Sequence, residues 1–197
     1  MSARPVASTV SDLLWPAPAD QRAFRAAVLV LLGSLLMAVS AKVQIPFYPV
    51  PMTLQPLVAL LLGIALGPRL GAASVVLYLV QGAAGLPIFA GTPERGIGLA
   101  YMVGPTGGYL IGFALAAYGA GWLARHYRSL LGAVAAALAG LALIYLPGVL
   151  WLSGFVGAGK ALTLGLLPFV PGDLVKAALA VALTLAGNRA LARQPTE

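Results

Sequence analysis

The chain has 197 residues, of which 60% are hydrophobic and only 9% are charged, and its mean hydropathy is +0.95. A water-soluble domain of this size needs more polar surface, so the composition predicts a polytopic membrane protein. The net charge of +7 is therefore interpreted as a topology signal and not as a nucleic-acid-binding surface, and the absence of cysteine excludes disulfides and thiolate metal sites.

The N-terminal segment, residues 1–21, contains three prolines and no sustained helical period, and we expect it to be cytoplasmic. Arg22 and Arg25 then precede an apolar run at about 24–42, which is long enough to span a bilayer. A cleavable signal peptide is the alternative for this run. The charged region before it and the apolar core are both longer than in a usual signal peptide, which favours an uncleaved helix.

Small residues recur along this first span and include Ser34 and Ala38, four positions apart. Such a pair allows a second helix to approach closely. Packing inside the bundle explains the spacing as well as docking of a partner does, so both interpretations stay open.

Five further helices are predicted by the apolar runs that follow, at about 54–66, from the turn at 67–71 to 84, 106–124, 130–152 and 170–188. A polar break at 153–168 separates the last two. The result is an all-α membrane protein with a six-helix transmembrane domain at 22–190 and a cytoplasmic tail at 191–197.

Two of the connecting loops have the composition of functional loops. Residues 45–53 contain three prolines, which exclude a regular helix and predict a stiff extended loop. Residues 85–98 are rich in glycine and proline and carry one arginine. Their apolar and aromatic side chains are typical of lids over an amphipathic ligand, although a membrane-interface aromatic belt explains the first loop as well.

Positive charges predict the orientation in the membrane. If the N-terminus is cytoplasmic, three basic residues face outward (Lys42, Arg95 and Lys160) and eight face inward (Arg4, Arg22, Arg25, Arg69, Arg125, Arg128, Arg189 and Arg193). This bias follows the positive-inside rule. We therefore expect a multi-pass protein of the cell membrane with both termini cytoplasmic.

The strongest candidate site begins the sixth predicted helix. Asp173 is the only one of five acidic residues that starts a long apolar run, and Lys176 follows three residues later on the same helix face. Ionisable side chains within a membrane pair with each other or face a cavity. The spacing is consistent with an internal ion pair that joins two helices and with a site for a polar ligand.

Other polar residues of the spans fall on the same outer side. Gln55 and Gln81 can each donate and accept hydrogen bonds, and Arg95 lies in the second loop. Either amide could simply join helices. Together with Asp173 and Lys176 they form the set of predicted ligand-binding residues.

The sequence contains no complete catalytic or nucleotide-binding motif. Residues 154–160 match a phosphate-binding loop up to Lys160, but the next residue is Ala161 where the motif requires serine or threonine. The metalloprotease and nucleophile-elbow motifs are absent from the sequence, as is a carboxylate pair suited to acid–base chemistry. We therefore expect neither an enzyme, nor a cofactor, nor an ATPase within the chain.

Several motifs, in order, resemble those of the BioY family, the biotin-specific substrate-capture (S) components of energy-coupling factor (ECF) transporters. The resemblance extends from about residue 24 to 188 and rests on residues 49–55, 62–67, 85–90, 104–110 and 171–176. It implies a six-helix S-component bundle with an outward-facing biotin site under the first and third outer loops. It also implies a separate transmembrane T component and two cytoplasmic ATPases. Small residues that dock on the T component would be Ser34 and Ala38, in place of the family's AxxxA pattern.

The chemistry of biotin is compatible with the candidate residues. Asp173 could accept a hydrogen bond from a ureido N–H, and Lys176 could donate to the ureido carbonyl. Gln55 and Gln81 could complete the polar set, with Arg95 on the carboxylate of the valerate chain.

Two other functions stay open at this stage. One is a secondary, ion-coupled transporter of another small organic acid or vitamin, although no inverted repeat is evident. The other is a membrane scaffold in which the Asp–Lys pair only joins helices. Whether the chain works alone, as a homo-oligomer or with partners is also open.

Overall fold

The structure is a computed structural model that describes residues 18–127 and 129–192. Six long helices form a bundle: α2 (Arg22–Lys42), α3 (Gln55–Leu66), α4 (Pro68–Ala83), α6 (Gly107–His126), α7 (Leu130–Val156) and α9 (Val170–Ala192). They confirm the number and order of the predicted helices. The shorter elements are η1 (Ala19–Gln21), β1 (Gln44–Ile45), β2 (Met52–Thr53), α5 (Gly98–Met102) and α8 (Ala158–Gly165).

Some predicted segments differ from the structure or lie outside its described part. The polar break predicted at 153–168 contains the last turn of α7 and the whole of α8, because Gly157, at φ +84°, ends one helix and the next begins directly after it. Most of the predicted N-terminal segment (1–21) and of the tail (191–197) lies outside the described residues. The same holds for Arg4, Arg128 and Arg193 of the predicted charge pattern.

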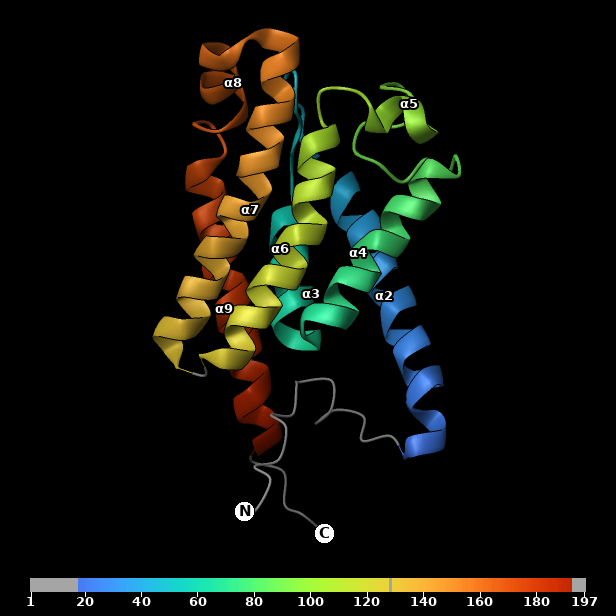
Figure 1. Ribbon diagram of the computed structural model, residues 1–197, viewed down its shortest axis with the longest axis vertical. Coiled ribbons are helices and arrows are strands. Elements are labelled where there is room, and N and C mark those ends of the chain that lie inside the picture. The colour runs from blue at the N-terminus through green and yellow to red at the C-terminus, as the bar shows by residue number, and fades with distance from the viewer. Residues whose placement is uncertain (1–17, 128, 193–197) are drawn as a thin grey trace.

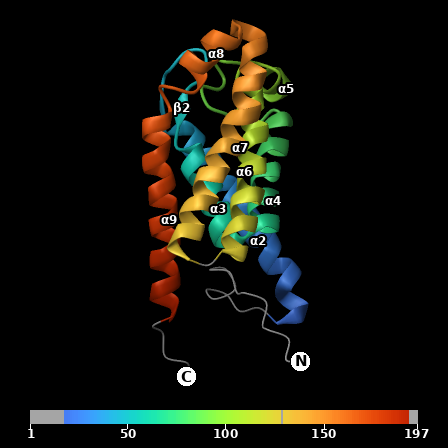
Figure 2. The same cartoon turned by 60° about the vertical axis from the view of Figure 1, so that its left-hand side comes forward.

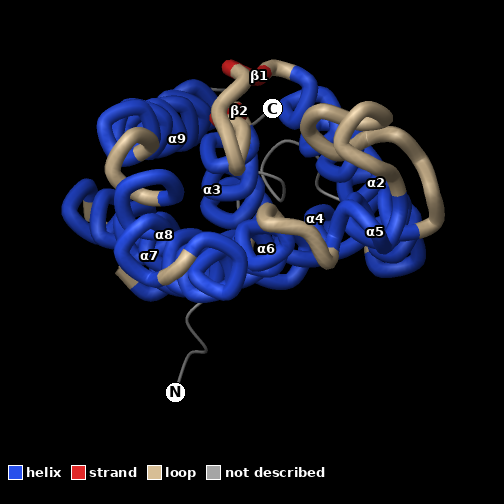
Figure 3. Tube along the Cα trace, turned by 90° about the horizontal axis from the view of Figure 1, so that it is seen from above, coloured by secondary structure: helices blue, strands red, loops and turns tan. Residues whose placement is uncertain are grey.

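The bundle has two distinct ends. The β hairpin, α5 and α8 lie at what we call the upper end, and α2 begins and α9 ends at the lower end (Figure 1). Seen from above, α3 and α6 lie between α2 and α4 on one side and α7 and α9 on the other (Figure 3). Figure 2 shows α9 standing at the edge of the bundle, along α3 and α7.

Four helices are long and apolar enough to cross a membrane: α2, α6, α7 and residues 170–187 of α9. The other two are shorter. The 12 residues of α3 rise only about 18 Å, whereas the hydrocarbon core of a bilayer is about 30 Å thick. An extended segment that includes β2 descends from the upper end to the start of α3 (Figure 1). Val50, Pro51 and Thr53 of this segment are buried in protein, which is where a membrane protein tolerates irregular backbone.

Many large apolar side chains are exposed and many small ones are buried, as expected for a protein in lipid. Leu131, Leu146 and Leu150 are at least 72% exposed. The buried side chains include many alanines, among them Ala59, Ala117, Ala120, Ala137 and Ala180. Lipid chains solvate leucine well, so small residues gather where helices meet and large apolar residues face outward.

In the lower half, α3, α4 and α6 meet through what we call the small-residue seam: Gly63, Gly71, Ala117 and Gly121. A Cβ atom added at Gly63 would collide with the backbone carbonyl of Ala117, and one at Gly121 would collide with the carbonyl of Gly63. One at Gly71 would lie 2.8 Å from the Gly63 backbone. Backbones this close leave no room for larger side chains, so the seam fixes the positions of these three helices.

Two loops cover the upper end. The first loop, residues 46–51, joins β1 to β2, which pair antiparallel with Gln44 opposite Thr53. The second loop, residues 84–97, joins α4 to α5. The predicted absence of regular helix from the proline-rich segment is confirmed.

Candidate functional site

Asp173 and Lys176 lie in the first two turns of α9 and face the interior of the bundle. The Nζ atom of Lys176 donates to Oδ1 of Asp173 at 2.7 Å, so the predicted pairing on one helix face is confirmed. Asp173 is 3% exposed and Lys176 is 8% exposed. A buried ion pair is stable only when its remaining polar atoms are also hydrogen-bonded.

The second carboxylate oxygen of Asp173 is bonded by a residue that sequence reasoning missed. The hydroxyl of Tyr145, from α7, donates to Oδ2 at 2.6 Å. Tyr145 lies within the long apolar run of α7, where only the phenolic hydroxyl signals a polar role. The sequence did contain one indication: a hydroxyl group on an uncharged, apolar helix needs a hydrogen-bond partner inside a membrane.

Gln55 opens α3 and lies at the centre of a second set of hydrogen bonds. Its Nε2 donates to the hydroxyl of Tyr78 at 3.0 Å, and its Oε1 accepts from the hydroxyl of Thr53 at 3.3 Å. Its backbone N–H donates to the same Thr53 hydroxyl at 3.2 Å. The side chain is therefore buried, at 2% exposure, with its orientation fixed from two sides.

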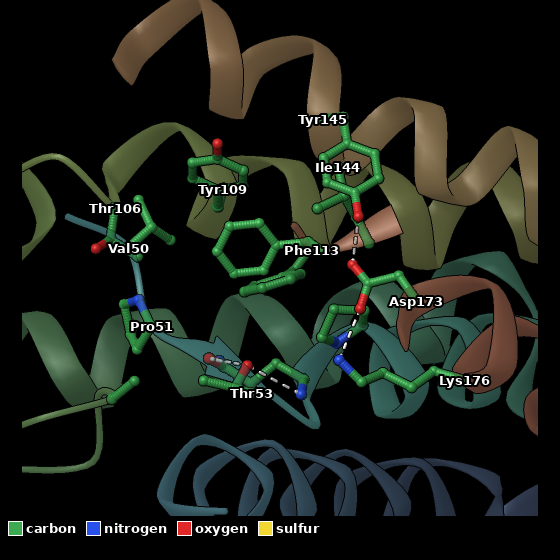
Figure 4. A pocket seen from close by; sticks show the side chains of 14 residues that line it. Val50, Pro51, Thr53, Thr106, Tyr109, Phe113, Ile144, Tyr145, Asp173 and Lys176 are labelled. Carbon is green, nitrogen blue, oxygen red and sulfur yellow. Dashed lines mark hydrogen bonds and ion pairs between the residues drawn. The ribbon is translucent and has the colours of Figure 1, made fainter. Parts of the chain in front are cut away.

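The polar groups of α3, α7 and α9 border one cavity (Figure 4). Its volume is about 30 Å³, which is room for one or two water molecules. Its walls are mostly apolar and come from both loops and from α3, α6, α7 and α9: Val50, Pro51, Thr53, Gln55, Pro56, Ala90, Thr106, Tyr109, Phe113, Ile144, Tyr145, Phe169, Asp173 and Lys176. An apolar cavity with a few convergent polar groups is the form that small-molecule sites take.

Gln81 and Arg95 do not line this cavity. Gln81 accepts a hydrogen bond from the hydroxyl of Ser34, which joins α4 to α2. Arg95 donates to the backbone carbonyls of Phe47 at 3.0 Å and Pro49 at 3.2 Å. The structure thus brings three of the five predicted ligand residues together, and ligand contact by Gln81 and Arg95 stays a prediction.

The two predicted docking residues face the interior of the bundle. Ser34 is fully buried and Ala38 is half-buried against the core. The exposed face of α2 carries larger side chains instead: Leu31, Leu32, Leu35, Leu36 and Val39. In this structure Ser34 packs within the bundle, as one interpretation of the small-residue spacing predicts. Docking of Ser34 and Ala38 on a partner stays a prediction.

The site offers hydrogen bonds and one compensated ion pair, without a metal-binding group. Within residues 18–127 and 129–192, no three carboxylate or histidine side chains come close enough together to hold a metal ion. The charges of Asp173 and Lys176 cancel, so the arrangement suits a neutral polar ligand better than a second anion.

Residues 11–193 match the BioY family. The "Probable biotin transporter BioY" of Pyrococcus horikoshii is 44% identical over 162 residues, which cover 81% of this chain and 95% of the relative. The "Biotin transporter BioY" of Thermotoga maritima is 42% identical over 151 residues, covering 76% and 88%. A solved structure, described as the S-component for biotin from an ECF-type ABC transporter, superposes with a TM-score of 0.73 at 25% identity. That superposition covers 91% of this chain and 96% of the other. Because the family match covers most of the chain and both relatives are more than 40% identical, the chain belongs to the BioY family.

Proposed function

We propose that this chain is the biotin-capture subunit of an ECF-type uptake transporter. The observation that carries the proposal is the buried Asp173–Lys176 pair that borders a largely apolar cavity in a chain of this family. The names of the relatives and of the structural neighbour support biotin as the ligand. In this function the chain binds and carries its ligand and catalyses no reaction.

The ureido ring of biotin fits the polar end of the cavity. It is neutral and offers N–H donors beside a carbonyl acceptor, so it can bond to Asp173 and Lys176 without adding net charge. Tyr145 holds the second oxygen of Asp173, which keeps the carboxylate in place. Gln55 supplies a further amide at the cavity wall. We infer that the ureido ring binds here and that the valerate carboxylate points toward the upper end.

The apolar part of biotin has matching surroundings. Phe113, Ile144 and Phe169 line the cavity beside the polar groups and can cover the fused rings and the thioether. The cavity of about 30 Å³ is too small for the whole molecule. Binding therefore requires residues of the cavity wall to move, and we infer that the loop residues Val50, Pro51 and Ala90 are among them.

We also propose the orientation and the partners. The described basic residues at the lower end, Arg22, Arg25, Arg69 and Arg125, favour a cytoplasmic lower end in the cell membrane. The cavity then opens outward, and a T component with two ATPases would act from below. Ion-coupled transport remains the competing mechanism; uptake that survives loss of the ATPases and stops with an uncoupler would favour it.

The direct test is equilibrium binding of labelled biotin to the detergent-purified chain without partners. We expect saturable binding that desthiobiotin, which keeps the ureido ring, reduces by competition and lipoate, which lacks it, does not. Asp173→Asn should abolish most binding, while the matched control Asp20→Asn, at an exposed aspartate, should not change it. A well-folded sample that binds no biotin would contradict the proposal.

A further inference from the structure

Lys42, in the last turn of α2, holds the second loop. Its Nζ donates to the carbonyls of Phe89 at 3.0 Å and Thr92 at 3.2 Å, and to the Thr92 hydroxyl at 2.9 Å. That hydroxyl in turn donates to the Phe89 carbonyl at 2.8 Å. One ammonium group thus satisfies three acceptors, and it fixes the second loop to the end of α2.

Arg95 continues the connection from the second loop to the first. Its guanidinium donates to the carbonyls of Phe47 and Pro49, the two residues that flank the tip of the first loop. The stem of Arg95 packs on Gly91, whose φ of +71° and lack of a side chain make room for it. The path of contacts therefore runs from α2 through the second loop to the first loop.

Both loops close the cavity, but they are held differently. In the second loop, Phe89 is fully buried, with its ring 4.9 Å from that of Tyr101 and 5.4 Å from that of Tyr78. Among the described residues, the first loop makes one ring contact, between Phe47 and Phe169 at 5.9 Å. The first loop is therefore the easier one to open, and the bonds from Arg95 resist that opening.

We propose that Lys42 and Arg95 are positioning residues that couple α2 to both loops and set the rate at which ligand enters and leaves the cavity. We call this pair the loop tie; its relation to biotin rests on the proposed function. Because α2 packs mainly on α4 at the edge of the bundle, a shift of α2 pulls the second loop at Lys42. Arg95 passes the displacement to the first loop, which carries Val50 and Pro51 of the cavity wall.

The tie can be tested without any ligand, because the chain contains no cysteine. Val50→Cys places a single thiol at a residue that is 4% exposed, and its rate of reaction with a maleimide reports how often the first loop opens. Adding Lys42→Met or Arg95→Met should speed labelling about fivefold, since each removes hydrogen bonds worth about 1 kcal/mol. Lys42→Arg, which keeps the charge, should retain slow labelling.

The matched control is Lys160→Met, which removes an exposed cation from α8, at the same end of the bundle. It should leave the labelling rate unchanged. Equal labelling rates in the Lys42, Arg95 and Lys160 variants would overturn the loop tie, whatever the ligand proves to be.

Ligand exchange separates the tie from a direct contact with the carboxylate. If Arg95 acts through the loop, Arg95→Met should speed dissociation of biotin and of its uncharged alcohol, biotinol, by the same factor of about five. A change confined to biotin would show that Arg95 binds the carboxylate and would overturn the tie. A wild-type chain that binds neither compound would contradict the proposed function, while the labelling series would still decide on the tie.

Discussion

The two halves of the bundle differ in what lies between their helices. In the lower half, the seam of Gly63, Gly71, Ala117 and Gly121 brings three helices together by leaving side-chain atoms out. In the upper half, α7 and α9 border a cavity and are joined by the side-chain hydrogen bond from Tyr145 to Asp173, while α6 still meets α7 closely at Gly108 and Gly112. The lower half fixes the positions of three helices, and the upper half holds the buried polar groups that we propose bind the ligand.

This difference follows from the apolar solvent. In lipid, burial of leucine supplies little drive for helices to associate, so contact between backbones takes its place. Polar groups are costly in the same solvent unless they are bonded, and Asp173, Lys176 and Gln55 all have partners before any ligand binds. Substitutions in the seam should therefore impair folding, whereas substitutions at the cavity should impair binding and leave the fold largely intact.

The largest effect is expected in the seam, for Gly63→Val. The new side chain would overlap the backbone of Ala117, and because backbone cannot move aside cheaply, we expect a loss of about 3 kcal/mol or more in stability. Thermal unfolding in detergent and the folded amount in membranes would measure it. Gly154→Ala, where an added Cβ meets nothing within 4 Å, is the control and should be harmless. A stable Gly63→Val protein would contradict the role of the seam.

The next largest effect is expected at the cavity, for Asp173→Asn. Replacing the carboxylate removes a charged acceptor, so we expect biotin affinity to fall about 100-fold, together with a loss of stability from the unpaired Lys176. Binding and unfolding are measured on the same sample. The double variant Asp173→Asn, Lys176→Met should recover stability without recovering binding. Recovery of both would show that the pair only joins helices.

A smaller effect is expected for Tyr145→Phe, which removes the hydroxyl and keeps the ring. Asp173 loses one of its two hydrogen bonds, and we expect biotin affinity to fall about fivefold because the carboxylate is held less firmly. Isothermal titration with biotin would measure the change. Tyr118→Phe, at a tyrosine that is 50% exposed on α6, is the matched control and should bind normally. Equal affinity in both variants would remove Tyr145 from the site.

The helices could be predicted because hydrophobic runs and their breaks are local properties. The first and sixth predicted spans, at 24–42 and 170–188, fall within α2 and α9. Gly67 alone separates α3 from α4, which begins at Pro68, so the turn predicted at 67–71 is shorter than expected. The predicted range at 54–66 already indicated a helix too short to span the bilayer alone, and the 12 residues of α3 confirm it. Whether the preceding loop lies inside the bundle or over its surface depends on tertiary packing, which a run of prolines does not specify.

Residues of the candidate site could be predicted where a charged or amide side chain stands in an apolar run, because such side chains are rare within a membrane. Asp173 and Lys176 stand out as charges in an apolar run, and Gln55 as an amide at the start of one. Tyr145 does not stand out, because tyrosine is ordinary in an apolar helix and its bond to Asp173 joins residues 28 positions apart. Gln81 looks equivalent to Gln55 in sequence, but its helix turns it toward α2. The direction in which a side chain points around a helix depends on packing partners that the sequence of one short helix does not reveal.

The smallest effect is expected for Gln81→Ala, and it tests that difference in direction. In this structure the amide of Gln81 joins α4 to α2 through Ser34, and hydrogen bonds between membrane helices contribute about 0.6 kcal/mol on average. We therefore expect a slightly lower unfolding temperature and unchanged biotin affinity. Ser34→Ala removes the same bond from the other side and should match it in both measurements. A loss of affinity in Gln81→Ala without one in Ser34→Ala would show that Gln81 contacts the ligand, as its sequence position predicts, and that α4 rotates when biotin binds.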